Sequence, residues 1–114
     1  MTSHATLPLA DLPPGTLKSF TVGGRRLVLA NADGQLRAAD ELCPHLAVPL
    51  SQGHIDAACL TCAGHGSVFR LSDGGVIKWM GRKPGLMSQL LSGKPTPLVL
   101  LPVTVVDGMV HVEL

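Results

Sequence analysis

Residues 43–65, CPHLAVPLSQGHIDAACLTCAGH, carry the most specific pattern in this chain. They begin with a Cys-x-His pair, Cys43 and His45, and end with a Cys-x-x-His pair, Cys62 and His65, with 16 residues between the pairs. Each pair lies in a Gly- or Pro-bearing loop that follows an apolar run. Two such loops can bring four ligands to one point, and thiolate with imidazole is a ligand set that suits zinc or iron. The pattern therefore predicts a metal centre built by two loops.

Fixed charge is missing around both pairs. Residues 42–55 and 57–69 contain no Asp, Glu, Lys or Arg, although the whole chain is 15% charged. All three cysteines and three of the five histidines lie in these two stretches. The composition favours a centre kept away from water and from fixed charge.

The flanking sequence alternates short apolar runs with turn signals such as Asp-Gly and Gly-Gly, which are typical of tight hairpins. Only one segment, Pro84–Ser92, is predicted to be helical, with about two turns before Gly93 and Pro95 end it. The pattern predicts a small all-β, antiparallel sandwich or barrel. The expected strands are Leu17–Val22, Arg26–Ala30, Leu36–Ala39, Leu60-Thr61, Ser67–Leu71, Val76–Trp79, Val103–Val106 and Met109–Glu113.

Composition narrows the class of protein. A chain of 114 residues predicts a single domain over residues 1–114. The 46% hydrophobic content and net charge of +1 argue against disorder, and 3% aromatic residues without a basic stripe argue against nucleic-acid binding. No apolar run is long enough to span a membrane, and no export signal begins the chain, so we expect a cytoplasmic protein. An odd count of three cysteines then favours metal or redox use over disulfides.

The two pairs resemble the Rieske iron–sulfur motif, Cys-x-His, about sixteen residues, then Cys-x-x-His. The resemblance extends to Pro49–Gly53, to Gly66–Phe69 and to the last hairpin, and so covers nearly the whole chain. It implies one [2Fe–2S] cluster held in a subdomain of two loops, residues 42–71. By the same resemblance, Cys43 and Cys62 hold one iron, and His45 and His65 hold the other, on the solvent side.

The resemblance is strongest to the ferredoxin components of bacterial ring-hydroxylating oxygenase systems. It implies a soluble, monomeric one-electron carrier that takes electrons from an NAD(P)H-dependent flavoprotein reductase and gives them to a terminal oxygenase. Such a carrier transforms no substrate, so the chain is not expected to be an enzyme in its own right, and no catalytic residue is assigned.

Histidine ligation moves a cluster potential from about −400 mV into a window of about −150 to +300 mV. High-potential members of the family add a disulfide at the positions of Val48 and Gly64, and a Tyr at the position of Phe69. Ser67 matches a Ser whose hydroxyl bonds to a cluster sulfur. The resemblance therefore implies a low-to-intermediate potential, raised slightly by Ser67.

Two other functions stay open at this point. The chain is also similar to the Rieske-type small subunit of an oxidoreductase complex such as nitrite reductase. The third reading is a structural zinc site that uses Cys59 with Cys43, Cys62 and His65. We expect Cys59 instead to be a buried apolar residue on the strand that enters the second loop. The remaining histidines, His4 in a mobile end, His54 and His111, are not expected to be ligands.

The largest departure from the family is an insert at residues 78–97. It carries Lys78, Arg82, Lys83 and Lys94 without an acidic residue, together with six large apolar side chains. It is either a lid that packs on the domain or an element that docks on an acidic partner.

Overall fold

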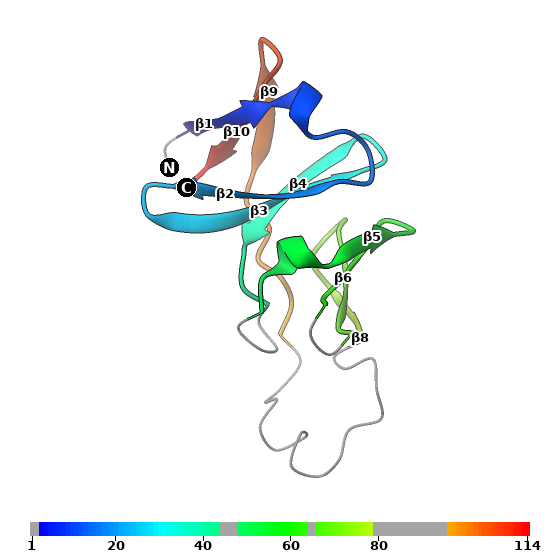
Figure 1. The fold of residues 1–114 in the computed structure, drawn as a ribbon. Helices are drawn as coiled ribbons and strands as arrows, with labels where there is room; N and C mark the ends of the chain where they lie inside the picture. The colour runs from blue at the N-terminus through cyan, green and yellow to red at the C-terminus, as the bar shows by residue number, and fades with distance from the viewer. Residues whose placement is uncertain (1–2, 44–47, 64–65, 79–95) are drawn as a thin grey trace.

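The computed structural model describes residues 3–43, 48–63, 66–78 and 96–114, which form three small antiparallel sheets (Figure 1). The sheet orders are β1-β10-β9, β2-β3-β4 and β5-β6-β7-β8. The elements are β1 (Ser3–Pro8), the 3-10 turn η1 (Leu9–Asp11), β2 (Leu17–Val22), β3 (Arg25–Ala32), β4 (Gln35–Asp40), the 3-10 turn η2 (Leu50–Gln52), β5 (His54–Asp56), β6 (Cys59–Thr61), β7 (Val68–Arg70), β8 (Val76–Lys78), β9 (Val103–Val106) and β10 (Met109–Glu113). The predicted all-β, antiparallel class is confirmed.

The sheet β2-β3-β4 is the middle layer of the molecule, between the other two sheets (Figure 1). Alternate residues of β3 point to opposite faces, as in any strand. Leu27 and Leu29 belong to a buried cluster with Val112 of β10, whereas Val28 and Ala30 belong to a second cluster with Phe69 of β7. One strand therefore serves two cores, and the second core supports the cysteine loops.

Three hairpin turns form where the sequence predicted them. Gly23-Gly24, Asp33-Gly34 and Asp107-Gly108 all have positive φ at both central residues. This is the backbone of a two-residue type I′ turn, for which glycine carries the least steric cost. The turn between β5 and β6 also has positive φ at both central residues, Ala57 and Ala58. Alanine is not a residue that signals this turn in a sequence.

Two strands were not predicted. β1 and β5 are both edge strands of their sheets, with few apolar residues, so the alternation of a half-buried strand is weak in them. The expectation of a mobile end around His4 is wrong, because His4 pairs with Val112 in the β1–β10 ladder.

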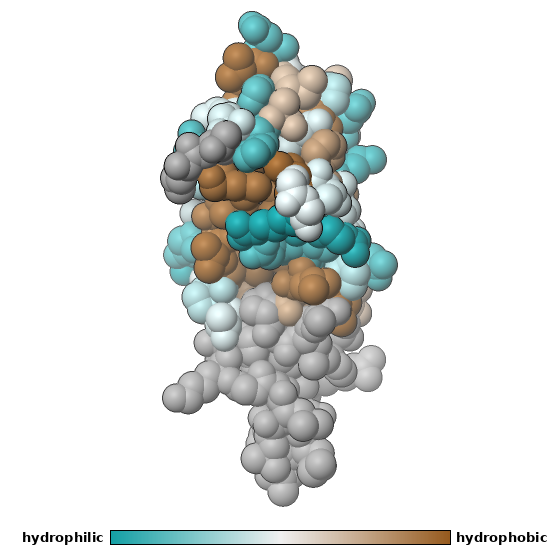
Figure 2. Space-filling model, turned by 90° about the vertical axis from the view of Figure 1, so that its left-hand side faces the viewer, coloured by the Kyte–Doolittle hydropathy of each residue, from teal (hydrophilic) through white to brown (hydrophobic). Residues whose placement is uncertain are grey.

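The predicted helix Pro84–Ser92 lies outside the described residues, as does the insert except for Lys78, Thr96 and Pro97. No helix among the described residues is long and apolar enough to cross a membrane. On the side shown in Figure 2, apolar and hydrophilic residues are mixed over the described surface, with a hydrophilic band across the middle.

Candidate metal centre

Cys43 and Cys62 occupy equivalent positions in two loops. Cys62 directly follows β6, and Cys43 lies three residues after the end of β4. The Cys43 amide donates to the carbonyl oxygen of Val48 (2.9 Å), and the Cys62 amide donates to the carbonyl oxygen of Ser67 (2.8 Å). In both cases the acceptor is five residues further along the chain. Each loop is thus closed at its base by the amide of its own cysteine.

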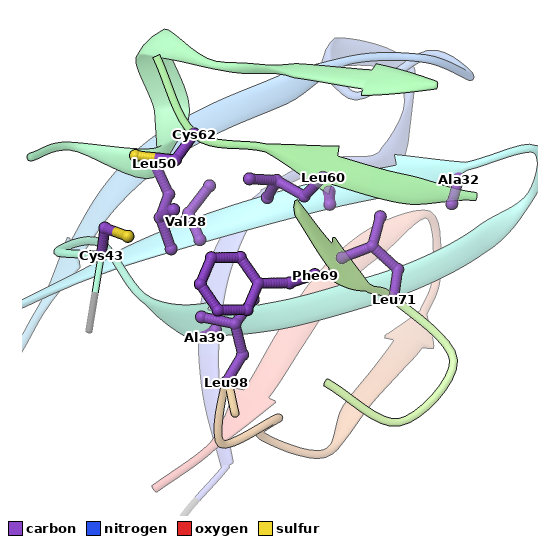
Figure 3. Close-up of a cluster of buried hydrophobic side chains, with 11 residues drawn as sticks. Val28, Ala32, Ala39, Cys43, Leu50, Leu60, Cys62, Phe69, Leu71 and Leu98 are labelled. Atoms are coloured by element: carbon purple, nitrogen blue, oxygen red, sulfur yellow. The ribbon is translucent and has the colours of Figure 1, made fainter. Parts of the chain in front are cut away.

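Both thiols are held inside the second core. Cys43 is 4% exposed and Cys62 is 3% exposed, and both belong to the cluster that contains Leu50 and Phe69. In Figure 3 the two cysteines lie on the same side of this cluster, next to Leu50. All three cysteines are in the described part of the chain, and none of them forms a disulfide. Two buried cysteines that share one cluster and form no disulfide fit the thiolate pair of a metal centre.

The first loop is tied down at its base by Glu41 and η2. The Leu50 amide donates to the Glu41 carbonyl oxygen (2.6 Å), and the Ser51 amide donates to Glu41 Oε1 (2.8 Å). A β-bridge between Leu42 and Pro49 lies between these contacts and the Cys43 amide. The Glu41 side chain is completely buried, and its Oε2 has no hydrogen-bond partner among the residues that the structure describes.

The described part of the second loop has a glycine at positive φ and two buried residues. Gly66 has a φ of 74°, a conformation that favours glycine. Ser67 and Phe69 are completely buried. Phe69 fills the core where high-potential relatives were expected to have a Tyr, so no phenolic hydroxyl is present at that position.

Two exposed ion pairs flank the cysteine-bearing segments. Arg25 donates two hydrogen bonds to Asp40 (2.7 and 3.0 Å), and these hold the pKa of Asp40 below its ordinary value. Arg70 likewise donates to Asp73, and this pair with the Gly75 amide lowers the pKa of Asp73 to about 2. The charges of these four residues are therefore paired at the surface, outside the apolar cluster that contains the two thiols.

The predicted ligands divide into two groups. The structure brings Cys43 and Cys62 into one cluster, whereas His45 and His65 lie outside the described residues. Cys59 lies on β6 as predicted but is only half-buried, opposite Arg70 of β7. Among the described residues, no three His, Cys, Asp or Glu side chains converge on a possible metal position, so Cys59 does not complete a zinc site with the other two cysteines.

The other histidines lie on strands. His4 is on β1, His54 is exposed on β5, and His111 on β10 is 3.3 Å from the Ser3 hydroxyl. Sequence reasoning gave no role to Glu41 or to Gly53, which shape the cysteine loops, although Gly53 lies in the stretch Pro49–Gly53 that carries the resemblance. The one signal for Glu41 is its place as the last charged residue before the uncharged stretch that begins at Leu42.

A protein-family model matches this chain over most of its length. The family model described as the Rieske [2Fe-2S] domain matches residues 3–102, which is most of the chain.

Known relatives agree with this match. The chain is 32% identical over 66 residues to the ferredoxin component of the naphthalene 1,2-dioxygenase system of Pseudomonas aeruginosa, covering 58% of this chain and 64% of the relative. It is 38% identical over 65 residues to the cholesterol 7-desaturase of Xenopus laevis, covering 55% of this chain and 14% of the relative. The chain thus spans less than two thirds of either relative.

A solved structure shares the fold. It is a chain from the complex of reduced oxygenase and oxidized ferredoxin in carbazole 1,9a-dioxygenase, with a TM-score of 0.77 and 25% identity. The match covers 96% of this chain and 91% of that chain. The small antiparallel architecture therefore occurs in a solved complex of an oxygenase and a ferredoxin.

Proposed function

The chain belongs to the Rieske [2Fe-2S] family, and on that premise we propose that it is a one-electron carrier between a flavoprotein reductase and a terminal oxygenase. The cofactor of this family is a [2Fe–2S] cluster. When bound, such a cluster would take up and release one electron. The observation that carries the proposal is the pair of equivalent loops, each closed by the amide of a buried cysteine.

We assign four ligands to the cluster. Cys43 and Cys62 are the thiolate ligands of one iron, and His45 and His65 are the imidazole ligands of the other, as the family motif implies. The donor set fits the group, because both cysteines are buried, outside any disulfide and in the same apolar cluster. The apolar surroundings exclude water and lower the local dielectric, which are the levers by which a protein tunes a cluster.

We assign no catalytic role to the chain. The named ferredoxin components among its relatives support a carrier, and the solved complex supports an oxygenase as one of its partners. An NAD(P)H-dependent flavoprotein reductase is the partner that would supply the electron. In this proposal the protein acts as a monomer that meets its two partners in turn.

Cysteine substitutions test the ligand assignment. The purified protein should contain two irons and two acid-labile sulfides per chain and should show the visible and electron paramagnetic resonance (EPR) spectra of a Rieske cluster. Cys43→Ser and Cys62→Ser should each lose the cluster, because each removes a thiolate ligand. Cys59→Ser is the matched control and should keep both irons. A normal visible spectrum in Cys43→Ser or Cys62→Ser would contradict the assignment, and a colourless wild-type protein that contains zinc would contradict the cofactor.

Electron transfer and mass test the carrier role. NADH with a flavoprotein reductase from a ring-hydroxylating oxygenase system should bleach the visible absorbance of the protein, whereas NADH alone should not. Light scattering of the protein purified from its own cells should give the mass of one chain. A tight complex with a second, larger chain would favour the alternative, a permanently bound subunit such as that of a nitrite reductase, a structure of which shares this fold at 21% identity and a TM-score of 0.71.

A further inference from the structure

The short turn η2 lies between the two cysteine-bearing segments and contacts both of them. It follows the first loop in sequence, and β5, which begins at His54, pairs with β6 just before Cys62. Its first residue, Leu50, is completely buried in the cluster that contains Cys43 and Cys62 (Figure 3). The η2 turn therefore contacts both the segment that carries Cys43 and the segment that carries Cys62.

The contact with the first segment is made by Glu41. Its carbonyl oxygen accepts from the Leu50 amide (2.6 Å) and its Oε1 accepts from the Ser51 amide (2.8 Å). Its own amide donates to the carbonyl oxygen of Arg26 on β3 (3.1 Å). Glu41 thus ties η2 to the middle sheet, two residues before Cys43.

The contact with the second segment is made by Gly53, the residue that directly follows η2. A Cβ atom at this position would overlap the carbonyl oxygen of Thr61, and it would lie 3.1 Å from the Thr61 carbonyl carbon. Both groups are backbone, so neither can turn aside as a side chain can. Gly53 therefore allows η2 to approach β6 directly beside Cys62.

The burial of Glu41 is costly and needs a reason. A buried carboxyl group is stable when its oxygens are hydrogen-bonded. In the described part of the chain Oε2 has no such partner, and Arg26 Nη2 is 3.8 Å away, beyond hydrogen-bond distance. We therefore expect Glu41 to make a contact that a smaller apolar residue could not make. The bond from Oε1 to the Ser51 amide is the contact that an apolar residue would lose.

We propose that η2, Glu41 and Gly53 form a bracket that fixes the separation of the Cys43 and Cys62 segments. Glu41 and Gly53 are positioning residues, which act through the loop backbone and do not touch the cluster. The inference rests on the proposed role of Cys43 and Cys62 as ligands. It adds that the spacing of these ligands is set by one short element with a contact on each side.

Substitution of Glu41 tests the first contact in the full-length protein with its cluster. Glu41→Ala should raise hydrogen–deuterium exchange in the peptide that contains Ser51 and should speed loss of the visible absorbance in EDTA by about tenfold, the change that corresponds to about 1.4 kcal/mol. It should also broaden the EPR signal. Glu41→Gln keeps an oxygen acceptor for the Ser51 amide and should restore slow exchange and slow cluster loss.

Asn31→Ala is the matched control for Glu41→Ala. Asn31 is also a buried polar residue with backbone partners, the carbonyl oxygen of Leu12 and the amide of Gly34, but it belongs to the opposite end of the middle sheet. Its loss should lower the stability of the fold without a change in the EPR signal or in exchange at Ser51.

Gly53→Ala tests the second contact, with Gly75→Ala as its control. A Cβ atom at Gly75 would meet only the ends of the Arg70 and Asp73 side chains, which can move away. Gly53→Ala should therefore change the EPR signal and speed cluster loss, and Gly75→Ala should do neither.

The outcomes separate this inference from the proposed function. If the wild-type protein lacks two irons and two sulfides, the proposed function fails. If the wild-type protein holds its cluster but Glu41→Ala matches Asn31→Ala in exchange at Ser51 and in EPR signal, the bracket alone is overturned. Failure of Glu41→Gln to restore slow exchange, or a Gly53→Ala protein with wild-type EPR signal and cluster retention, would also overturn it.

Discussion

Ser67 is a completely buried hydroxyl in the second cysteine loop, and its carbonyl oxygen closes that loop by accepting from the Cys62 amide. The family resemblance places a hydroxyl donor to a cluster sulfur at this position. A hydrogen bond to the cluster stabilises the reduced, more negative state and so raises the potential. Ser67→Ala should therefore lower the midpoint potential by about 40 mV, which corresponds to a bond of about 1 kcal/mol in a one-electron couple.

A redox titration of wild type and Ser67→Ala measures this shift. Ser51→Ala is a useful control, because Ser51 contributes its backbone amide to the first loop and alanine keeps that amide. An unchanged midpoint potential in Ser67→Ala would mean that the Ser67 hydroxyl does not bond to the cluster and that Ser67 contributes only packing.

The Arg70–Asp73 ion pair gives a pH dependence that can be measured. Hydrogen bonds from Arg70 and from the Gly75 amide lower the pKa of Asp73 from 3.8 to about 2 in the folded protein. A carboxyl group whose pKa falls on folding stabilises the folded state above its unfolded pKa, and this contribution is lost as the pH drops toward the folded pKa. Asp73→Asn should therefore lower stability at pH 7, and the difference from wild type should shrink between about pH 4 and about pH 2.

Urea unfolding of both proteins across this pH range gives the comparison. Both partners are largely exposed, so the effect should be small and should weaken in high salt. A difference that is independent of pH would mean that Asp73 acts through the turn backbone and not through its charge.

The hairpin between β5 and β6 is the element in which the local sequence fits its backbone least well. Ala57 and Ala58 have φ values of 49° and 62°, a region that is unfavourable for a residue with a Cβ atom. The double substitution Ala57→Asn and Ala58→Gly supplies the residues that a type I′ turn favours. It should raise the free energy of unfolding by about 1 kcal/mol, measured by urea denaturation.

A β-branched residue gives the opposite test of the same turn. Ala58→Val should lower stability, because its side chain is more crowded at positive φ. If Asn-Gly at this turn failed to stabilise the protein, the positive φ values of the alanines would not be a source of strain.

The elements show why part of the fold could be predicted from sequence. The sequence predicts three of the hairpins because the turn backbone itself requires residues such as Gly23-Gly24, Asp33-Gly34 and Asp107-Gly108. The β5–β6 turn carries alanines, and its backbone is imposed by pairing with the rest of the sheet, so no local signal predicts it. The edge strands β1 and β5 were missed for a related reason, since an edge strand with one neighbour needs few apolar residues.

The candidate site also has one part that the sequence predicts and one part that it does not. Thiol and imidazole spacing predicts the cysteine loops, because ligand chemistry restricts which residues can serve. Glu41 and Gly53 act by contacts with residues ten and eight positions away along the chain, Ser51 and Thr61. Contacts of this kind depend on the folded backbone, and the residue types alone do not indicate which groups Glu41 and Gly53 meet.

At the scale of the whole molecule, β3 joins the two cores. Leu27 and Leu29 face the core shared with β10, and Val28 and Ala30 face the core that holds the cysteine loops. Neither core can lose its packing without exposing one face of the same strand. A two-core molecule built on one shared strand should therefore unfold in a single step.

Leu29→Ala tests this coupling from the side away from the cysteines. Leu29 is completely buried, so the substitution should lower the free energy of unfolding by about 2–5 kcal/mol. Because β3 also supports the core around Cys43 and Cys62, the urea midpoint for loss of the visible absorbance should fall together with the midpoint for loss of the far-ultraviolet circular dichroism. The visible midpoint could instead stay at its wild-type value while the circular dichroism midpoint fell. The cysteine loops would then be stable without the core that contains Leu29, and β3 would not couple the two cores.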